Sequence, residues 1–222
     1  MRSPTLLALC LMAGFQTAQA ASVQVTVLAR DGQPLPDAVV VLEPAAGQAM
    51  PAATPVNHII TQEKMQFNPA VSVVPVGSRV KFANMDRWDH HVRGGPAGLV
   101  ATGTYGFEFR LAGREAGKTP PSSELALDKA GPIQLGCHLH GSMRGVVYVS
   151  PTPWAAKTSD TGVATLAEVP EGAMRVRVWH PDQLLDPAAI TVQVQAVTAV
   201  NVPTQVQPRK ARRVQTAPSD TY

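Results

Sequence analysis

Residues 136–145 read Gly-Cys-His-Leu-His-Gly-Ser-Met-Arg-Gly, and the apolar run 146–149 that follows them predicts a buried strand. Within seven residues, Cys137, His140 and Met143 offer a thiolate, an imidazole and a thioether. Soft sulfur combined with imidazole is the donor set that suits copper in both oxidation states. Such a copper site takes a second imidazole, so one histidine must come from elsewhere in the chain.

The second imidazole is expected upstream of this loop. A strand-like segment at 78–83 runs into a loop that ends in His90 and His91. A lone cysteine is more often a small buried apolar residue than a ligand. Here the cysteine has histidines at +1 and +3, a methionine at +6, glycines on both sides and a second histidine-bearing loop, and this combination favours a metal site.

The resemblance to a known family rests on several separate segments. These are Phe67-Asn68-Pro69, the run 76–84, His90, and the pattern Cys-x-x-His-x-x-Met-x-Gly at 137–145. Together they resemble the plastocyanin and amicyanin branch of the cupredoxins, and the two-residue gap before Met143 is similar to the short ligand loop of amicyanin. Segments 89–92, 135–137 and 179–181 are also similar to periplasmic cupredoxin-domain proteins that carry the label methylamine utilisation protein.

The resemblance implies a ligand set for one copper ion per chain that cycles between Cu(I) and Cu(II). The implied ligands are His90, Cys137, His140 and Met143, with Met143 as the weak axial ligand. Asn84 matches the family asparagine that ties the two ligand loops together, and His91 is expected just outside the ligands, facing solvent. His138 is expected at the surface, and His58 and His180 are not expected to bind metal.

The pattern along the chain predicts an all-β fold. Alternation at 22–27, a turn at Asp31-Gly32 and an apolar run at 38–42 indicate two strands, and no helical periodicity competes with them. Many short strands with turn signals indicate a sandwich, and the resemblance makes it a Greek-key β-sandwich of the cupredoxin type. Residues 93–104 are glycine-rich and are expected to be without regular structure.

The segments on either side of the copper-type region resemble the two halves of a carboxypeptidase-regulatory or transthyretin-like sandwich. We therefore predict a first half at 21–53, the copper domain at 54–150 and the second half at 151–203. The alternative is two sequential units, or extra strands wrapped on one sandwich.

The first 20 residues have the pattern of a Sec-type export signal. Arg2 provides a positive start, residues 6–15 form an apolar run, and Ala18-Gln19-Ala20 fits the small-residue cleavage rule. The run is shorter than the roughly 18 residues that a membrane anchor needs. We expect cleavage after Ala20, a periplasmic protein and no transmembrane segment after signal removal.

Loss of these residues leaves 202 of the 222, with Cys137 as the only cysteine because Cys10 lies in the signal. No intramolecular disulfide is then possible, and a bound metal would protect a thiol that is otherwise a liability in an oxidising compartment.

The net charge of +3 is unevenly distributed. The tail at 204–222 has four basic residues against Asp220, so the rest of the exported chain is close to neutral and gives no indication of nucleic-acid binding. The tail has no periodicity and is expected to be disordered, serving either solubility or the steering of an acidic partner or membrane surface.

The function predicted from these observations is one-electron transfer, not enzymatic catalysis. The partner would be a redox protein such as a c-type cytochrome or a dehydrogenase. Copper delivery or storage is the alternative, because methionine and histidine are abundant around the loop. A copper oxidase or nitrite reductase would need further copper centres, for which six histidines are too few. A metal-free sandwich would leave Cys137 without a role.

Overall fold

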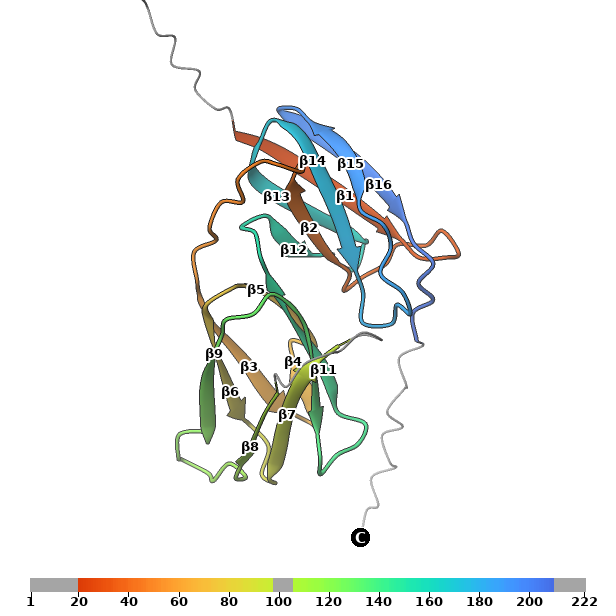
Figure 1. The fold of residues 1–222 in the computed structure, drawn as a ribbon. Helices are drawn as coiled ribbons and strands as arrows, with labels where there is room; N and C mark the ends of the chain where they lie inside the picture. Colours follow the sequence, from red (N-terminus) through yellow and green to blue (C-terminus); the bar gives the residue numbers. More distant parts are fainter. Residues whose placement is uncertain (1–19, 98–105, 210–222) are drawn as a thin grey trace, which may run out of the picture.

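The computed structural model describes residues 20–97 and 106–209, which form sixteen strands and no helix (Figure 1). The predicted all-β fold class is confirmed. Within these ranges no helix could span a membrane. The predicted export signal and the tail beyond residue 209 fall outside the described residues, except that Ala20 begins the first strand.

One pair of sheets is built from the two ends of the described chain and lies in the upper part of Figure 1. Its three-stranded sheet has the order β13 (Val163–Pro170), β1 (Ala20–Leu28), β16 (Val197–Pro203). Its four-stranded sheet has the order β12 (Ala155–Lys157), β2 (Val39–Pro44), β14 (Gly172–Trp179), β15 (Ile190–Val194).

The core of this sandwich follows from strict alternation in β1. Val23, Val25 and Val27 are buried and point to the facing sheet, where Val40 and Leu42 of β2 belong to the same core. Because successive side chains of a strand point to opposite faces, the polar residues between them face away from this core.

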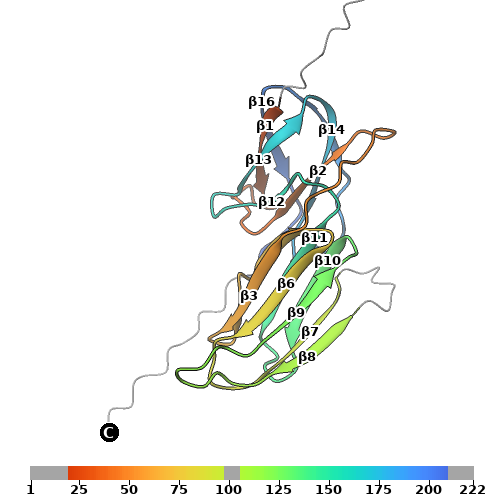
Figure 2. The ribbon, with the colours of Figure 1, turned by 90° about the vertical axis from the view of Figure 1, so that its left-hand side faces the viewer.

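The second pair of sheets is formed by residues 57–150 and lies below the first in Figures 1 and 2. Its five-stranded sheet has the order β5 (Val71–Pro75), β11 (Arg144–Ser150), β10 (Gly131–Cys137), β7 (His90–Pro96), β8 (Phe107–Leu111). Its four-stranded sheet has the order β4 (Gln66–Asn68), β3 (Asn57–Glu63), β6 (Ser78–Asn84), β9 (Ser122–Leu127).

The two sheets of the second pair pack face to face. Phe82 of β6 contacts the rings of Phe107 and Phe109 of β8 at centroid distances of 5.8 and 5.5 Å. Ile60, Val92 and Val147 are completely buried in the same core, and Cys137 and Met143 belong to it as well. The predicted copper ligands therefore lie at the edge of an apolar interior.

A third apolar cluster joins the two sandwiches. Val39 and Val41 of β2 pack with Val146 and Tyr148 of β11 and with Trp179, whose ring lies 5.7 Å from that of Tyr148. All six residues of β2 are buried, because one face of this strand contacts its own core and the other contacts the copper-type region.

One prediction about the chain path was wrong. Residues 93–96 were expected to lack regular structure, yet they continue β7 between β8 and β10. Gly94 is required there by close approach, since a Cβ atom at this position would lie 2.3 Å from the ring of Phe107. Gly94 therefore marks a crowded strand and not a loop. The remainder of the expected loop, 98–104, lies outside the described residues.

Candidate metal centre

Three donor side chains meet where β7 and β10 lie side by side. His90 is the first residue of β7, Cys137 is the last residue of β10, and Cys137 pairs with Val92 in the antiparallel ladder. His140 follows in the loop to β11. His90 and Cys137 are 0% and 4% exposed, whereas His140 is only partly buried.

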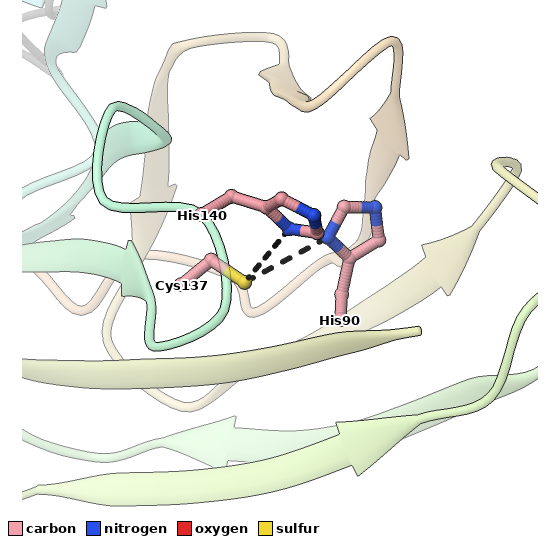
Figure 3. A group of neighbouring side chains, drawn as sticks. All are labelled: His90, Cys137 and His140. Carbon is pink, nitrogen blue, oxygen red and sulfur yellow. Dashed lines mark hydrogen bonds between the residues drawn. The ribbon is translucent and has the colours of Figure 1, made fainter. Parts of the chain in front are cut away.

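The geometry of the three donor atoms fits a single metal ion. Cys137 Sγ lies 3.7 Å from His90 Nδ1 and 3.6 Å from His140 Nδ1 (Figure 3). With the bond lengths known for zinc, about 2.0–2.1 Å to nitrogen and about 2.3 Å to sulfur, ligands of one ion lie about 3.6–3.8 Å apart. The separations therefore match those around one ion, and a thiolate with two imidazoles is a donor set that suits copper.

Met143 is placed on the buried side of the same loop. Its side chain is 2% exposed, and its backbone N–H donates to the carbonyl of His140 at 2.9 Å, which closes the turn. Met143 and Cys137 also line one groove of about 710 Å³. The loop therefore brings Cys137, His140 and Met143 to one end of the core.

An aspartate that the sequence analysis did not identify holds the first histidine. His90 Nε2 lies 2.9 Å from Asp86 Oδ2, and Asp86 is 7% exposed. Because a carboxylate accepts hydrogen bonds, this contact places the ring proton on Nε2 and leaves the Nδ1 lone pair facing Cys137. The only signal in the sequence was an acidic residue in the same loop, four positions before the predicted ligand.

The same carboxylate supports a hairpin turn between β3 and β4. Asp86 accepts the backbone N–H groups of Lys64 at 2.7 Å and Met65 at 3.0 Å. Lys64 and Met65 have φ values of 53° and 58°, as a two-residue type I′ turn requires, although neither is a glycine or an asparagine. Burial by itself would raise the pKa of Asp86, but the hydrogen bonds from Met65, His90 and Lys64 outweigh it and lower that pKa.

Asn84 organises the upstream loop. Its side-chain oxygen accepts the N–H of Asp86 at 2.9 Å, and its nitrogen donates to the carbonyls of Trp88 and Ala112, both at 2.8 Å. None of its hydrogen bonds within the described ranges reaches the loop 137–143. The bridge expected from Asn84 is instead made by the backbone, where the N–H of His138 donates to the carbonyl of His91 at 3.0 Å.

Asp89, the residue directly before the predicted ligand His90, also has defined partners. Its carboxylate accepts the backbone N–H of Gly113 at 2.9 Å and the guanidinium of Arg110 at 2.8 and 3.0 Å. The N–H of Gly113, followed by Arg110, lowers the pKa of Asp89. The segment that carries His90 is thus tied to the chain beyond β8.

The remaining histidines lie outside the three-residue group. His91 and His138 face each other on the outer side, with ring centroids 4.8 Å apart. His58 contacts Ser72 Oγ at 2.9 Å, and burial lowers its pKa. The Nδ1 atom of His180 accepts the N–H of Asp182, and burial lowers its pKa against the opposing effect of that aspartate.

Solved structures similar to this chain are cupredoxins that match about half of it. The reduced state of an amicyanin mutant is 24% identical, with coverage of 50% of this chain and 92% of the other, at a TM-score of 0.32. A purple cupredoxin from Nitrosopumilus maritimus is 19% identical, covering 42% and 99%, at 0.34. A pseudoazurin from Sinorhizobium meliloti is 21% identical, covering 44% and 76%, at 0.33. No family model and no curated protein matches the chain.

Proposed function

We propose that this chain is a periplasmic protein that binds one copper ion through His90, Cys137, His140 and Met143 and carries one electron to or from a redox protein. The convergence of two imidazole nitrogens on one buried thiol, at 3.6 and 3.7 Å, is the observation that carries this proposal. Copper, when bound, supplies a one-electron couple between Cu(II) and Cu(I).

The protein contributes ligands that are already in place. Cys137 is fixed at the end of β10 by the ladder to β7, and Asp86 orients the ring of His90. Ligands that need little movement fit both oxidation states with little reorganisation, which favours a carrier. Within the described ranges no hydrogen bond holds Nε2 of His140, so this partly exposed ring offers a path for the electron to a partner.

The proposed roles of the remaining residues follow from their contacts. Met143, on the buried side of the loop, would supply the weak axial sulfur that helps to set the potential. Asn84 and Asp86 would keep the upstream loop in shape, and His91 would remain outside the ligands. The proposed role of this group is electron transfer, not catalysis.

The test is to add Cu(II) to the purified metal-free protein. We expect one equivalent to produce intense visible absorption from thiolate-to-copper charge transfer, and Cys137→Ser to abolish the colour. The matched control is Ser142→Ala in the same loop, which should keep it. Tight binding without that absorption would refute the assignment of Cys137 as a ligand.

The alternative, copper delivery, makes a different prediction for the same sample. A carrier retains copper when it is mixed with a competing chelator or an apo partner, whereas a delivery protein transfers it. The buried positions of His90 and Cys137 favour retention. The proposal includes a redox partner such as a c-type cytochrome or a dehydrogenase. It also includes export by the predicted signal, which is tested by the intact mass of periplasmic protein beginning at Ala21.

A further inference from the structure

Three polar side chains gather on the outer face of the sheet, directly behind the candidate copper centre. His91 Nε2 lies 3.8 Å from Glu108 Oε2, and His138 Nε2 lies 3.7 Å from the same oxygen atom. The imidazole rings are 4.8 Å apart and inclined at 48°. All three side chains are accessible, with exposed fractions of 32%, 66% and 45% for His91, Glu108 and His138.

The backbone holds the two histidines at this spacing. His91 is the second residue of β7, and His138 directly follows β10, the neighbouring strand. The N–H of His138 donates to the carbonyl of His91 at 3.0 Å. Glu108 comes from β8 on the other side of β7, diagonally across from His91. The three side chains therefore come from three adjacent strands of one rigid sheet.

We propose that His91, His138 and Glu108 form a second metal site, which binds a divalent transition-metal ion at the surface. Two imidazoles and one carboxylate are donors that suit both Zn²⁺ and Cu²⁺. Cu²⁺ is expected to bind more tightly, because such sites generally have a higher affinity for Cu²⁺ than for Zn²⁺. Three protein donors leave room for water to complete the coordination.

The two distances to Glu108 require only small movements, whereas the two imidazole nitrogens must move further. Ligands of one tetrahedral ion lie about 3.3–3.5 Å apart when the bonds are about 2.0–2.2 Å. The two nitrogen–oxygen separations of 3.7 and 3.8 Å exceed this by a few tenths of an ångström. Among the described residues only the His90, Cys137 and His140 set has all its donor atoms within 4.8 Å of one another, so the metal must draw the outer imidazoles together. Rotation of exposed side chains can supply that movement.

The two arginines near Glu108 are held in other contacts and do not pair with its carboxylate. Arg110, opposite His91 in the ladder, is bound by Asp89 through two hydrogen bonds. Arg93 lies opposite Glu108, but its side chain runs over Gly136, where a Cβ atom would lie 3.3 Å from Arg93 Nε. Among the residues that the structure describes, Glu108 therefore has the two histidines as its charged or ionisable neighbours.

The site is independent of the buried one in its donors and adjacent to it in the chain. His91 follows the predicted ligand His90, and His138 follows the predicted ligand Cys137. Alternation along the strands directs each pair of neighbours to opposite faces of the sheet. An ion on the outer face would therefore bind without displacing one in the buried group.

Equilibrium dialysis of untagged protein against Cu²⁺, and separately against Zn²⁺, tests the proposal. Wild type should bind one equivalent more than the His91→Ala/His138→Ala double variant. In the Cu²⁺ arm the extra equivalent should give a separate, weakly coloured paramagnetic signal with nitrogen coupling. Each single histidine variant should lower the affinity for the additional metal ion by at least roughly 100-fold. Loss of a group outside the ligands typically lowers it by about 10- to 100-fold.

Matched controls separate this site from general effects. His58→Ala removes an imidazole elsewhere, and Glu124→Gln removes an exposed carboxylate that pairs with Arg79; both should keep the extra equivalent. Glu108→His should tighten it, since a third imidazole suits both ions. Equal stoichiometry in wild type and the double variant overturns the proposal. If the buried group failed to give an intensely coloured copper complex, the difference of one equivalent would still decide the outer site.

Discussion

Replacement of Asp86 by asparagine should weaken both the metal-free fold and the copper site, because one carboxylate supports two structures. Asp86 accepts hydrogen bonds from Lys64 N, Met65 N and His90 Nε2 at 2.7 to 3.0 Å. Asparagine has nearly the same shape, but one of its two polar atoms is a donor. At least one of the three donors then loses its acceptor, and the others exchange a charged acceptor for a neutral one.

The size of the effect follows from these contacts. A buried donor left without an acceptor costs about 1–3 kcal/mol, and each bond that loses its charged partner costs about 1 kcal/mol more. We expect the Asp86→Asn variant to lose roughly 3–5 kcal/mol of unfolding free energy in the absence of metal. Chemical denaturation of the metal-free protein measures this. Glu124→Gln, which removes an exposed ion pair with Arg79, should change it by less than about 1 kcal/mol.

The copper site should respond in a second, separate measurement. Loss of the carboxylate behind His90 is expected to reduce copper affinity by about 10- to 100-fold, as is typical for such a partner. The reduction potential should rise, because a negative charge that favours Cu(II) over Cu(I) has been removed. Unchanged stability and unchanged potential in Asp86→Asn would refute the assignment of this carboxylate to His90.

A variant of the hairpin separates the two roles of Asp86. Lys64→Asn/Met65→Gly places at the turn the residues that prefer its positive φ values, so it should stabilise the protein by about 1 kcal/mol. The same change leaves Asp86 and His90 in contact and should leave the potential unchanged. A shift in potential in this variant would show that the turn, and not the carboxylate, controls the histidine.

Three further predictions concern other parts of the molecule. Met143→Leu should keep the copper and raise the reduction potential, since it removes a weak axial donor; loss of copper binding would contradict that role. Burial lowers the pKa of both His58 and His180. As the pH drops, these histidines are therefore protonated in the unfolded chain before they are protonated in the folded protein. The free energy of unfolding should fall below about pH 6.5, by up to about 1.4 kcal/mol per pH unit for each histidine. Denaturation at pH 7.5 and 5.5 should show a smaller fall for His180→Gln than for wild type. Gln62 is completely buried, and neither polar atom of its side chain has a partner among the described residues. Gln62→Met should therefore stabilise the metal-free protein by about 1–3 kcal/mol. A lower denaturation midpoint in this variant would contradict the prediction.

Part of the candidate site could be predicted from the sequence because its spacing is local. Cys137, His140 and Met143 share one short loop, so nearly any fold that closes this loop brings them to the same region. His90 lies 47 residues before Cys137, and its position depends on the pairing of β7 with β10. Only the resemblance to cupredoxins selected it, since local pattern does not distinguish His90 from His91.

Asp86 and β7 show what the sequence could not indicate. The contacts of Asp86 with residues 64 and 65 depend on how the β3–β4 hairpin lies against the upstream loop, and no spacing in the chain records this. In β7, glycines at 94 and 95 look like a loop because they have no strand propensity. The ring of Phe107 fills the space above Gly94, and that contact comes from another strand.

The flanking sandwich contributes to the site by fixing one end of the ligand loop. β11 begins at Arg144, directly after Met143, and its side chains alternate between two apolar environments. Val147 and Val149 enter the copper-type core, whereas Val146 and Tyr148 pack against Val39, Val41 and Trp179 of the other sandwich. A strand held on both faces cannot shift without opening one of these contacts, and the other end of the loop is held by the ladder from β10 to β7. The loop that carries Cys137, His140 and Met143 is thus anchored at both ends, which is how an all-β frame can keep the donors in place before a metal binds.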